Sequence, residues 1–335
     1  MMQRRARSNP LAWWWALLTL ASGGNIALWF LLYREFHSQP TGSLNNTSDM
    51  EFMLLLCAAY VFGCAFRSLL PRADIQRICL FDTWLSSVLV GRSVATVAEI
   101  CFAMQWAMVL RQLGGLTGGG TTLNIAWAIV PLILTAQCCS WYGVLTTNCL
   151  ANAIENSIWA VAFFVVGIGL CRLLPEFDGP VRLALVVAIA GIASYLGFLM
   201  TIDVPMYLSR WQAGLADGRK LLGPLEGLRD ASTRWVVTRD FVHWKEEIAW
   251  MSLYFTAAVW ASLALCLVYS LGDHLLRYRT ESAVVSSPEF RTEHHTTTEA
   301  HEPNSAYQSL QASASLKTRA SVANLSAPSA WLVRR

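Results

Sequence analysis

The chain has 335 residues, of which 55% are hydrophobic and only 14% charged, and its formal net charge is +3. A soluble domain usually carries about a quarter charged residues, so this composition excludes an ordinary soluble protein and indicates a membrane protein. Because no basic stripe stands out, we expect no nucleic-acid partner. The lipid bilayer is the expected partner, and the length allows roughly six to eight membrane spans.

The amino terminus carries Arg4, Arg5 and Arg7, which precede an uncharged run over residues 11–33. A basic start before an apolar run is also typical of a signal peptide, and residues 21–23 have the small side chains of a cleavage site. The apolar run resumes directly after this site, and its length suits a span better than a signal. We therefore interpret the run as an uncleaved first span.

Two glycosylation acceptors, Asn45 and Asn46, lie in the polar segment after the first span. A second span is predicted over residues 52–66, and the basic segment 67–77 follows it. The third span is predicted within residues 78–110, which exceed the length of one bilayer crossing. Its first turns are therefore expected at the interface or as a half-helix.

The rest of the chain predicts four more spans and two polar segments. These spans are predicted over residues 125–145, 158–171, 183–202 and 248–271. Between the fourth and fifth spans, Asn148, Asn152, Glu155 and Asn156 form a polar step. A solvated turn is the favoured interpretation of this step, and a polar helical face is the alternative.

The longest internal polar segment covers residues 203–247. At its start, Asp203 precedes Pro205, which favours a plain helix stop over a kink that faces a cavity. Further along, leucines recur at helical spacing among charged residues, which predicts an amphipathic helix near the membrane surface. These leucines are Leu221, Leu222, Leu225 and Leu228. We expect this segment to be cytosolic and to offer a surface for protein partners.

Beyond residue 276 the composition changes to Ser, Thr, Ala, Glu and His, which predicts a disordered polar tail over 277–335. Residues 1–276 are then the helix bundle. The predicted fold class is all-α: a polytopic transmembrane helix bundle of about seven spans with a disordered C-terminal tail. The spans must be helical because backbone polar groups in hydrocarbon need partners within the span.

Basic residues indicate the orientation of the bundle. The amino terminus, segment 67–77 and segment 210–245 all fall on one side of a seven-span chain, and the positive-inside rule makes that side cytosolic. Asn45 and Asn46 then lie outside. Together with the absence of a transit peptide, these acceptors favour the plasma membrane or an endomembrane over an organellar membrane.

The side on which the tail lies stays open. Seven spans place it outside, which agrees with a further glycosylation acceptor at Asn324. In contrast, Arg277 and Arg279 directly follow the last span and favour the inside. A tyrosine-based sorting pattern over residues 307–310 also favours the inside.

The third predicted span contains three ionisable residues: Asp82, Arg92 and Glu99. A charge at the bilayer centre costs at least ~2.5–3.5 kcal/mol, so such residues usually have a partner or a task. Arg92 and Glu99 share a helical face but lie ~10.5 Å apart along the axis. Direct pairing would need both side chains to stretch, and pairing with other helices is equally compatible.

The acids near other helix ends, Glu155 and Asp203, complete a candidate intramembrane charge network of five residues with Asp82, Arg92 and Glu99. This network has two interpretations. It is either a set of salt bridges that locks the bundle or a functional site, such as a proton relay, an ion pathway or a polar ligand pocket. In the functional case Glu99 exchanges the proton, and Arg92 is a fixed positive charge.

No motif predicts a catalytic centre, a cofactor or a metal. The nine cysteines lack zinc-ligand spacing and a redox CxxC, so they are expected to be small buried hydrophobes. HExxH and GxSxG are absent, as are the motifs of G-protein-coupled receptors and the lysine of a retinal protein.

Three functions remain, in this order. The first is a transporter or an ion- or proton-coupled carrier that uses the intramembrane charges. The second is a structural or adaptor protein whose 203–247 segment and tail recruit partners. The third is a membrane-embedded lipid-modifying enzyme, for which Asp82, Glu155 and Asp203 would have to meet at one membrane face. A water-sized cavity at Glu99 would favour transport, whereas a dry, closed network would favour the structural role.

Overall fold

The computed structural model describes residues 10–38 and 47–285. The glycosylation candidates Asn45, Asn46 and Asn324 lie outside the described residues, as does the part of the predicted tail beyond residue 285. The helices are α1 (Pro10–Ser38), α2 (Thr47–Leu69), α3 (Val88–Thr117), α4 (Gly120–Thr146), α5 (Cys149–Leu173), α6 (Gly179–Phe198), α7 (Val204–Ala216), α8 (Pro224–Thr233), α9 (Phe241–Leu253) and α10 (Val259–Val285). The helical run of α10 thus passes residue 277, where the tail was predicted to begin.

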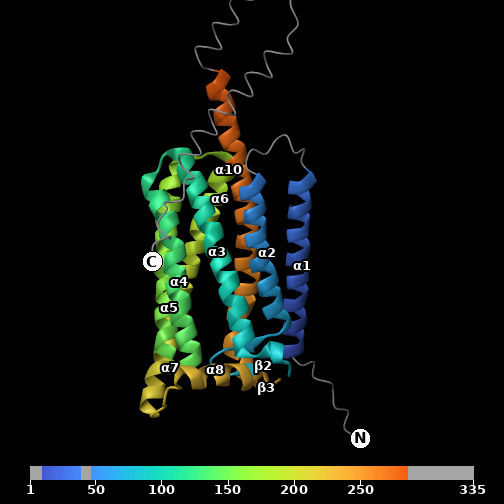
Figure 1. Ribbon diagram of the computed structural model, residues 1–335, viewed down its shortest axis with the longest axis vertical. Helices are drawn as coiled ribbons and strands as arrows, with labels where there is room; N and C mark the ends of the chain where they lie inside the picture. The colour runs from blue at the N-terminus through green and yellow to red at the C-terminus, as the bar shows by residue number, and fades with distance from the viewer. Residues whose placement is uncertain (1–9, 39–46, 286–335) are drawn as a thin grey trace, which may run out of the picture. The chain divides into compact units, whose positions relative to one another are not determined.

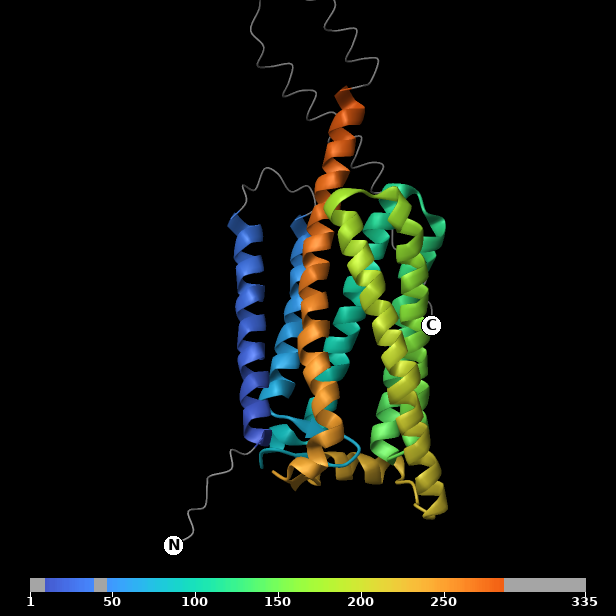
Figure 2. The same ribbon diagram turned by 180° about the vertical axis from the view of Figure 1, so that it is seen from behind.

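Seven helical spans in the described chain are long and apolar enough to cross a membrane, as the composition predicted. From α1 to α6, each helix packs against the next along the chain. Figures 1 and 2 show neighbouring helices running in opposite directions, with α2 beside α1 and α5 beside α4. Length and composition are therefore consistent with a multi-pass membrane protein.

One end of the bundle collects the basic segments. The start of α1, the loop between α2 and α3, and the α7–α8 segment all lie at this end (Figures 1 and 2). We call it the basic end, because it contains the segments 67–77 and 210–245. This arrangement agrees with the placement of these segments on one side of the membrane.

The third span is α3, which begins at Val88 inside the predicted segment 78–110 and ends at Thr117, seven residues beyond it. α3 starts at Val88, where the hydroxyl of Ser87 accepts a hydrogen bond from the backbone N–H of Val90 at 3.4 Å and caps the helix. The apolar residues before it fold into a loop in which Cys79 and Leu80 are buried. The excess apolar length of segment 78–110 therefore belongs to a packed loop and not to a half-helix.

A small sheet at the basic end was not predicted. Strand β1 (Arg72–Ala73) runs antiparallel to β2 (Ile78–Cys79), which runs parallel to β3 (Val236–Val237). The positive φ of Arg77, 56°, turns the chain just before β2. The sheet joins the segment after α2 to the segment after α8, so the spans are all-α but the basic end is not.

The sixth span continues past the predicted helix stop. α6 leads through a π-helical segment, η3 (Leu199–Asp203), directly into α7. Pro205 has no N–H, and in a regular α-helix its ring collides with the carbonyl four residues earlier. The wider π turn precedes this proline and takes up the distortion, so the helix continues to Ala216. A second π-helical segment, η4 (Tyr254–Ala258), joins α9 to α10 in the same way.

The predicted amphipathic helix exists as α8, but its leucines do not face the bundle. The buried residues of α8 are Gly227 and Ala231, whereas Leu225 is 84% exposed and Leu228 is 42% exposed. Close approach explains the difference, because a Cβ on Gly227 would lie 2.1 Å from the carbonyl oxygen of Leu145. Small residues therefore dock α8 under α4, and the leucines stay on the outer surface.

Substitution of Gly227 by Ala should undock α8. The added methyl group would overlap the backbone of Leu145, and we expect a loss of about 1–3 kcal/mol of stability. Thermal unfolding of the detergent-purified protein measures this loss. Gly223→Ala is the matched control, because its φ of −67° suits alanine and nothing lies within 4 Å of an added Cβ. Equal stability of the two variants would contradict this docking.

Candidate functional site

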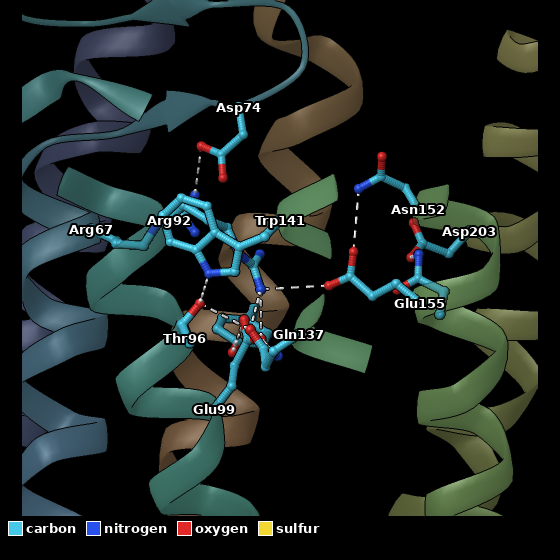
Figure 3. A network of polar contacts seen from close by, with 12 residues as sticks. Arg67, Asp74, Arg92, Thr96, Glu99, Gln137, Trp141, Asn152, Glu155 and Asp203 are labelled. Atoms are coloured by element: carbon cyan, nitrogen blue, oxygen red, sulfur yellow. Dashed lines mark hydrogen bonds and ion pairs between the residues drawn. The ribbon is translucent and has the colours of Figure 1, made fainter. Parts of the chain in front are cut away.

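The buried guanidinium of Arg92 is the centre of a polar network inside the bundle (Figure 3). Its Nη2 donates to Glu99 Oε2 at 3.0 Å and to Gln137 Oε1 at 2.7 Å. The same nitrogen lies 3.5 Å from Glu155 Oε1. Arg92 and Glu99 come from α3, Gln137 from α4 and Glu155 from α5, so this one group connects three spans.

The direct pairing of Arg92 and Glu99 follows from their place on one helical face. The two side chains bridge two turns of α3, and a third residue of that face, Thr96, lies between them. The hydroxyl of Thr96 donates to Gln137 Oε1 at 3.0 Å and accepts from Trp141 Nε1 at 3.0 Å. The side chains of Arg92 and Glu99 therefore extend toward each other and pair directly, and side chains of α4 pack around this pair.

Glu99 has further partners on other helices. Its Oε2 accepts from Gln137 Nε2 at 2.5 Å, and its Oε1 accepts from the hydroxyl of Tyr254 at 3.1 Å. Tyr254 opens the π-helical segment η4, so the last span also joins the network. Every carboxylate oxygen of Glu99 thus has a donor.

The polar step between the fourth and fifth spans is not a solvated turn. Asn148 caps α5, and its side chain accepts from the backbone N–H of Leu150 at 3.0 Å. Asn152 and Glu155 are 5% and 7% exposed, and the Asn152 amide donates to Glu155 Oε2 at 3.2 Å. The favoured solvated-turn interpretation is therefore wrong, because α5 begins at Cys149 and turns this polar face inward.

The absence of a side chain at Gly143 leaves space for that polar face of α5. A Cβ on Gly143 of α4 would lie 2.5 Å from Asn152 Oδ1, so only glycine lets the two helices approach here. α4 ends at Thr146, and its C-cap Thr147, with a φ of 58°, reverses the chain into the Asn148 cap. The turn geometry thus brings Glu155 back to the level of Arg92.

Asp203 is buried but belongs to the edge of the network. It is 5% exposed, and its Oδ2 accepts from the side-chain amide of Asn156 at 2.6 Å. Asn156 is the residue after Glu155 on α5, and Asp203 ends the π-helical segment η3. Asp203 therefore connects to Glu155 through α5 and not by a direct contact with Arg92.

Asp82 does not join the network. Its side chain accepts a hydrogen bond from the indole of Trp235 at 2.9 Å, next to the small sheet of the basic end. This corrects its placement inside the third span, which begins only at Val88. Of the five predicted residues, Arg92, Glu99 and Glu155 meet directly, Asp203 lies beside them, and Asp82 lies apart.

Sequence reasoning missed Gln137 and Tyr254. Gln137 is a lone amide in the apolar run 125–145, and an isolated polar residue in such a run predicts a polar partner inside the bundle. Tyr254 carries no such signal, because a tyrosine near a helix end also fits the membrane interface. Its inward direction depends on the π-helical segment η4.

A second charged cluster lies at the basic end. Arg72 is 2% exposed, and its Nη2 donates to Asp74 Oδ1 at 2.8 Å and to the carbonyl of Val88 at 2.6 Å. Arg67 Nη2 lies 3.6 Å from the same carboxylate oxygen. Burial opposes ionisation of Asp74, but Arg72, Arg67 and Arg92 outweigh it and lower its pKa to about 2. Asp74 is thus ionised at neutral pH.

Arg72 keeps its charge despite its burial. Burial lowers its pKa to about 10, and the nearby Asp74 carboxylate limits the decrease. A Cβ on Gly91 would lie 2.5 Å from the Arg72 guanidinium, so glycine leaves the space that this side chain fills against α3. The sequence showed three arginines and one acid in segment 67–77 but did not show which of them would be buried.

No metal or catalytic centre emerges from these residues. Within residues 10–38 and 47–285, no three His, Cys, Asp or Glu side chains form a group that could hold a metal ion. An apolar groove of about 300 Å³ lies between α4 and α5, with Cys138, Tyr142 and Ile154 in its lining. None of its lining residues belongs to the Arg92 network. The groove is therefore separate from the Arg92 network.

Substitution of Asp74 by Asn should remove an acid-sensitive part of the stability. A carboxyl with a lowered pKa stabilises the fold above its unfolded value of 3.8, and this contribution falls as the pH drops toward about 2. A shift of this size corresponds to about 2 kcal/mol at neutral pH. Thermal unfolding between about pH 5 and pH 2.5 should show the decrease for the wild type and not for Asp74→Asn.

The exposed Asp217 at the same end provides the control, because Asp217→Asn should keep the wild-type acid dependence. If Asp74→Asn and the wild type lose stability in parallel over this pH range, the three arginines do not stabilise the Asp74 carboxylate.

The comparisons with known proteins leave the identity of the chain open. No protein-family model matches the sequence, and no curated protein or solved structure is significantly similar to it. The function must therefore be argued from the site itself.

Proposed function

We propose that the protein is a membrane carrier coupled to proton movement, in which Glu99 and Glu155 bind the proton and Arg92 is the fixed positive charge. One observation carries the proposal: two buried carboxylates on different helices lie 3.0 and 3.5 Å from a single guanidinium. The three groups lie within spans that are long and apolar enough to cross a membrane.

The balance of charges in this centre favours a bound proton. One guanidinium neutralises one carboxylate, and a second buried carboxylate without its own cation is strongly unfavourable in a medium of low dielectric constant. Two other buried cations, Arg67 and Arg72, already contact Asp74 at the basic end. A proton shared between Glu99 and Glu155 removes the excess negative charge, and its release restores that charge.

Two distortions of the helices support a carrier that changes conformation. Tyr254 begins the segment η4 and donates to Glu99, and Asp203 ends the segment η3 and accepts from Asn156. π-helical segments are rare and occur frequently at functional sites. A change in the protonation of Glu99 or Asp203 would act directly on one of these segments.

Orientation and location follow from the sequence and are part of the proposal. The positive-inside rule places the basic end in the cytosol. The paired acceptors at Asn45 and Asn46 then lie outside the cytosol and favour the plasma membrane or an endomembrane. Proton binding at Glu99 would occur inside α3, 11 residues after its start at Val88 and 18 residues before its end at Thr117.

A structural or adaptor role is the second candidate, and a specific observation favours it. Both carboxylate oxygens of Glu99 have donors, as expected for a network that locks helices together. In addition, Leu225 and Leu228 of α8 are exposed at the basic end and offer an apolar surface to a partner. The lipid-modifying enzyme receives less support, because Asp82 lies apart from Glu155 and Asp203.

Proton flux in proteoliposomes tests the proposal. We expect the wild type to dissipate an imposed pH gradient, measured with an entrapped pH-sensitive dye, faster than empty liposomes. Glu99→Gln and Glu155→Gln should each reduce the flux at least about tenfold, because they remove a proton-binding group from the pathway. Arg92→Gln should abolish flux by leaving two carboxylates without a cation.

Thermal unfolding of the same preparations separates the two candidate functions. Asp178→Asn is the control, since its side chain is 97% exposed and its loss should leave flux and stability unchanged. A wild type that conducts no more than empty liposomes would contradict proton coupling. A loss of about 3–5 kcal/mol of stability in Arg92→Gln together with absent wild-type flux would identify a structural network.

A further inference from the structure

A pair of cysteines lies in the middle of the bundle, away from the charged network. Cys57 on α2 and Cys266 on α10 are both 0% exposed, and both thiols contact the hydrogen-bonded pair of Gln105 and Ser262. Ser262 Oγ lies 3.5 Å from Cys57 Sγ, and Gln105 Nε2 lies 3.6 Å from Cys266 Sγ. Three helices, α2, α3 and α10, thus contribute to one compact cluster.

The polar side chains in this cluster are suited to stabilise sulfur. Gln105 and Ser262 are 0% exposed, and such groups are costly in an apolar interior unless they have partners. The Gln105 amide donates toward Cys266 Sγ, and the Ser262 hydroxyl is shared between Cys57 Sγ and Gln105 Oε1, which lies 2.6 Å away. The Gln105 amide therefore provides a neutral donor to Cys266 Sγ, and the Ser262 hydroxyl lies beside Cys57 Sγ.

Further sulfur atoms follow the same face of α2. Met50, Met53, Cys57 and Cys64 recur at helical spacing, and their exposures are 7%, 0%, 0% and 3%. The thiol of Cys266 also approaches the carbonyl oxygen of Met53 at 3.9 Å. These residues extend along most of the length of α2, which runs from Thr47 to Leu69. Ordinary core packing explains buried methionines, but it does not explain paired thiols with their own polar donors.

We propose that Cys57 and Cys266 bind a monovalent soft metal ion, Cu(I). Thiolate and thioether ligands select Cu(I) over harder cations. Zinc would need four protein ligands in a structural site, and the described residues provide no such group here. As the two copper–sulfur bonds form, one thiol releases its proton and the other binds as a neutral thiol, so Cu(I) and one thiolate neutralise each other and no electron is transferred.

This site is independent of the proposed proton centre. Gln105 and Glu99 lie on the same helix, and a rise of 1.5 Å per residue separates them by ~9 Å along its axis. No hydrogen bond or ion pair of Arg92 reaches Cys57 or Cys266. The Glu99→Gln variant should therefore bind copper as the wild type does. The Cys57→Ser and Cys266→Ser variants should keep the proton flux of the wild type.

Titration of the full chain with Cu(I) tests the site. The reduced protein in detergent is titrated without oxygen in competition with a chromophoric Cu(I) chelator, and we expect one tightly held copper per chain. Cys57→Ser and Cys266→Ser should each weaken binding by about 100-fold or more, and Gln105→Leu by about 10–100-fold. Cys138→Ser and Cys171→Ser, which change exposed thiols, are the matched controls and should bind as the wild type does.

Two measurements keep the test valid if a variant folds poorly. Cu(I) should raise the melting temperature of the wild type and of Cys138→Ser but not that of Cys266→Ser. X-ray absorption at the copper edge of the wild-type complex should show only sulfur neighbours. Binding that persists in the Cys57→Ser/Cys266→Ser double variant would overturn the proposal, as would nitrogen or oxygen neighbours of the bound copper.

Discussion

A guanidinium buried inside an apolar bundle must be neutralised, and much of the geometry of this protein follows from that requirement. Arg92 is 7% exposed, and its partners come from α3, α4 and α5. Each partner must reach the same nitrogen, so the three helices are held in one register relative to each other. Removal of one member of such a buried group typically costs about 3–5 kcal/mol, which is comparable with the whole stability of many domains.

Other irregular features of the bundle lie where side chains must reach this centre. Gly143 lets α4 and α5 approach until Asn152 and Glu155 face inward. The segments η3 and η4 interrupt two spans at Asp203 and Tyr254, which connect to the same polar region. A regular α-helix would place these side chains at other angles, so the two distortions and the network belong together.

The basic end uses different interactions to close the bundle. Arg72 fills the space left by Gly91 and pairs with Asp74, and the small sheet ties this loop to the segment after α8. α8 then docks through Gly227 and leaves its leucines exposed. The charged centre, the sulfur pair and the basic end are thus different regions of one bundle, and each can be tested by its own substitutions.

The sequence alone was sufficient to predict seven apolar helical spans and the charges inside them, because hydropathy, span length and the cost of a buried charge are local properties. It also placed Arg92 and Glu99 on one face, since helical periodicity is local. Only the tertiary structure decided that Glu155 is buried beside Arg92, that Asp82 is not in the membrane span and that α8 docks by its glycine. These outcomes depend on contacts between residues on different elements, such as Gly227 with Leu145 and Trp235 with Asp82, which the local sequence does not specify.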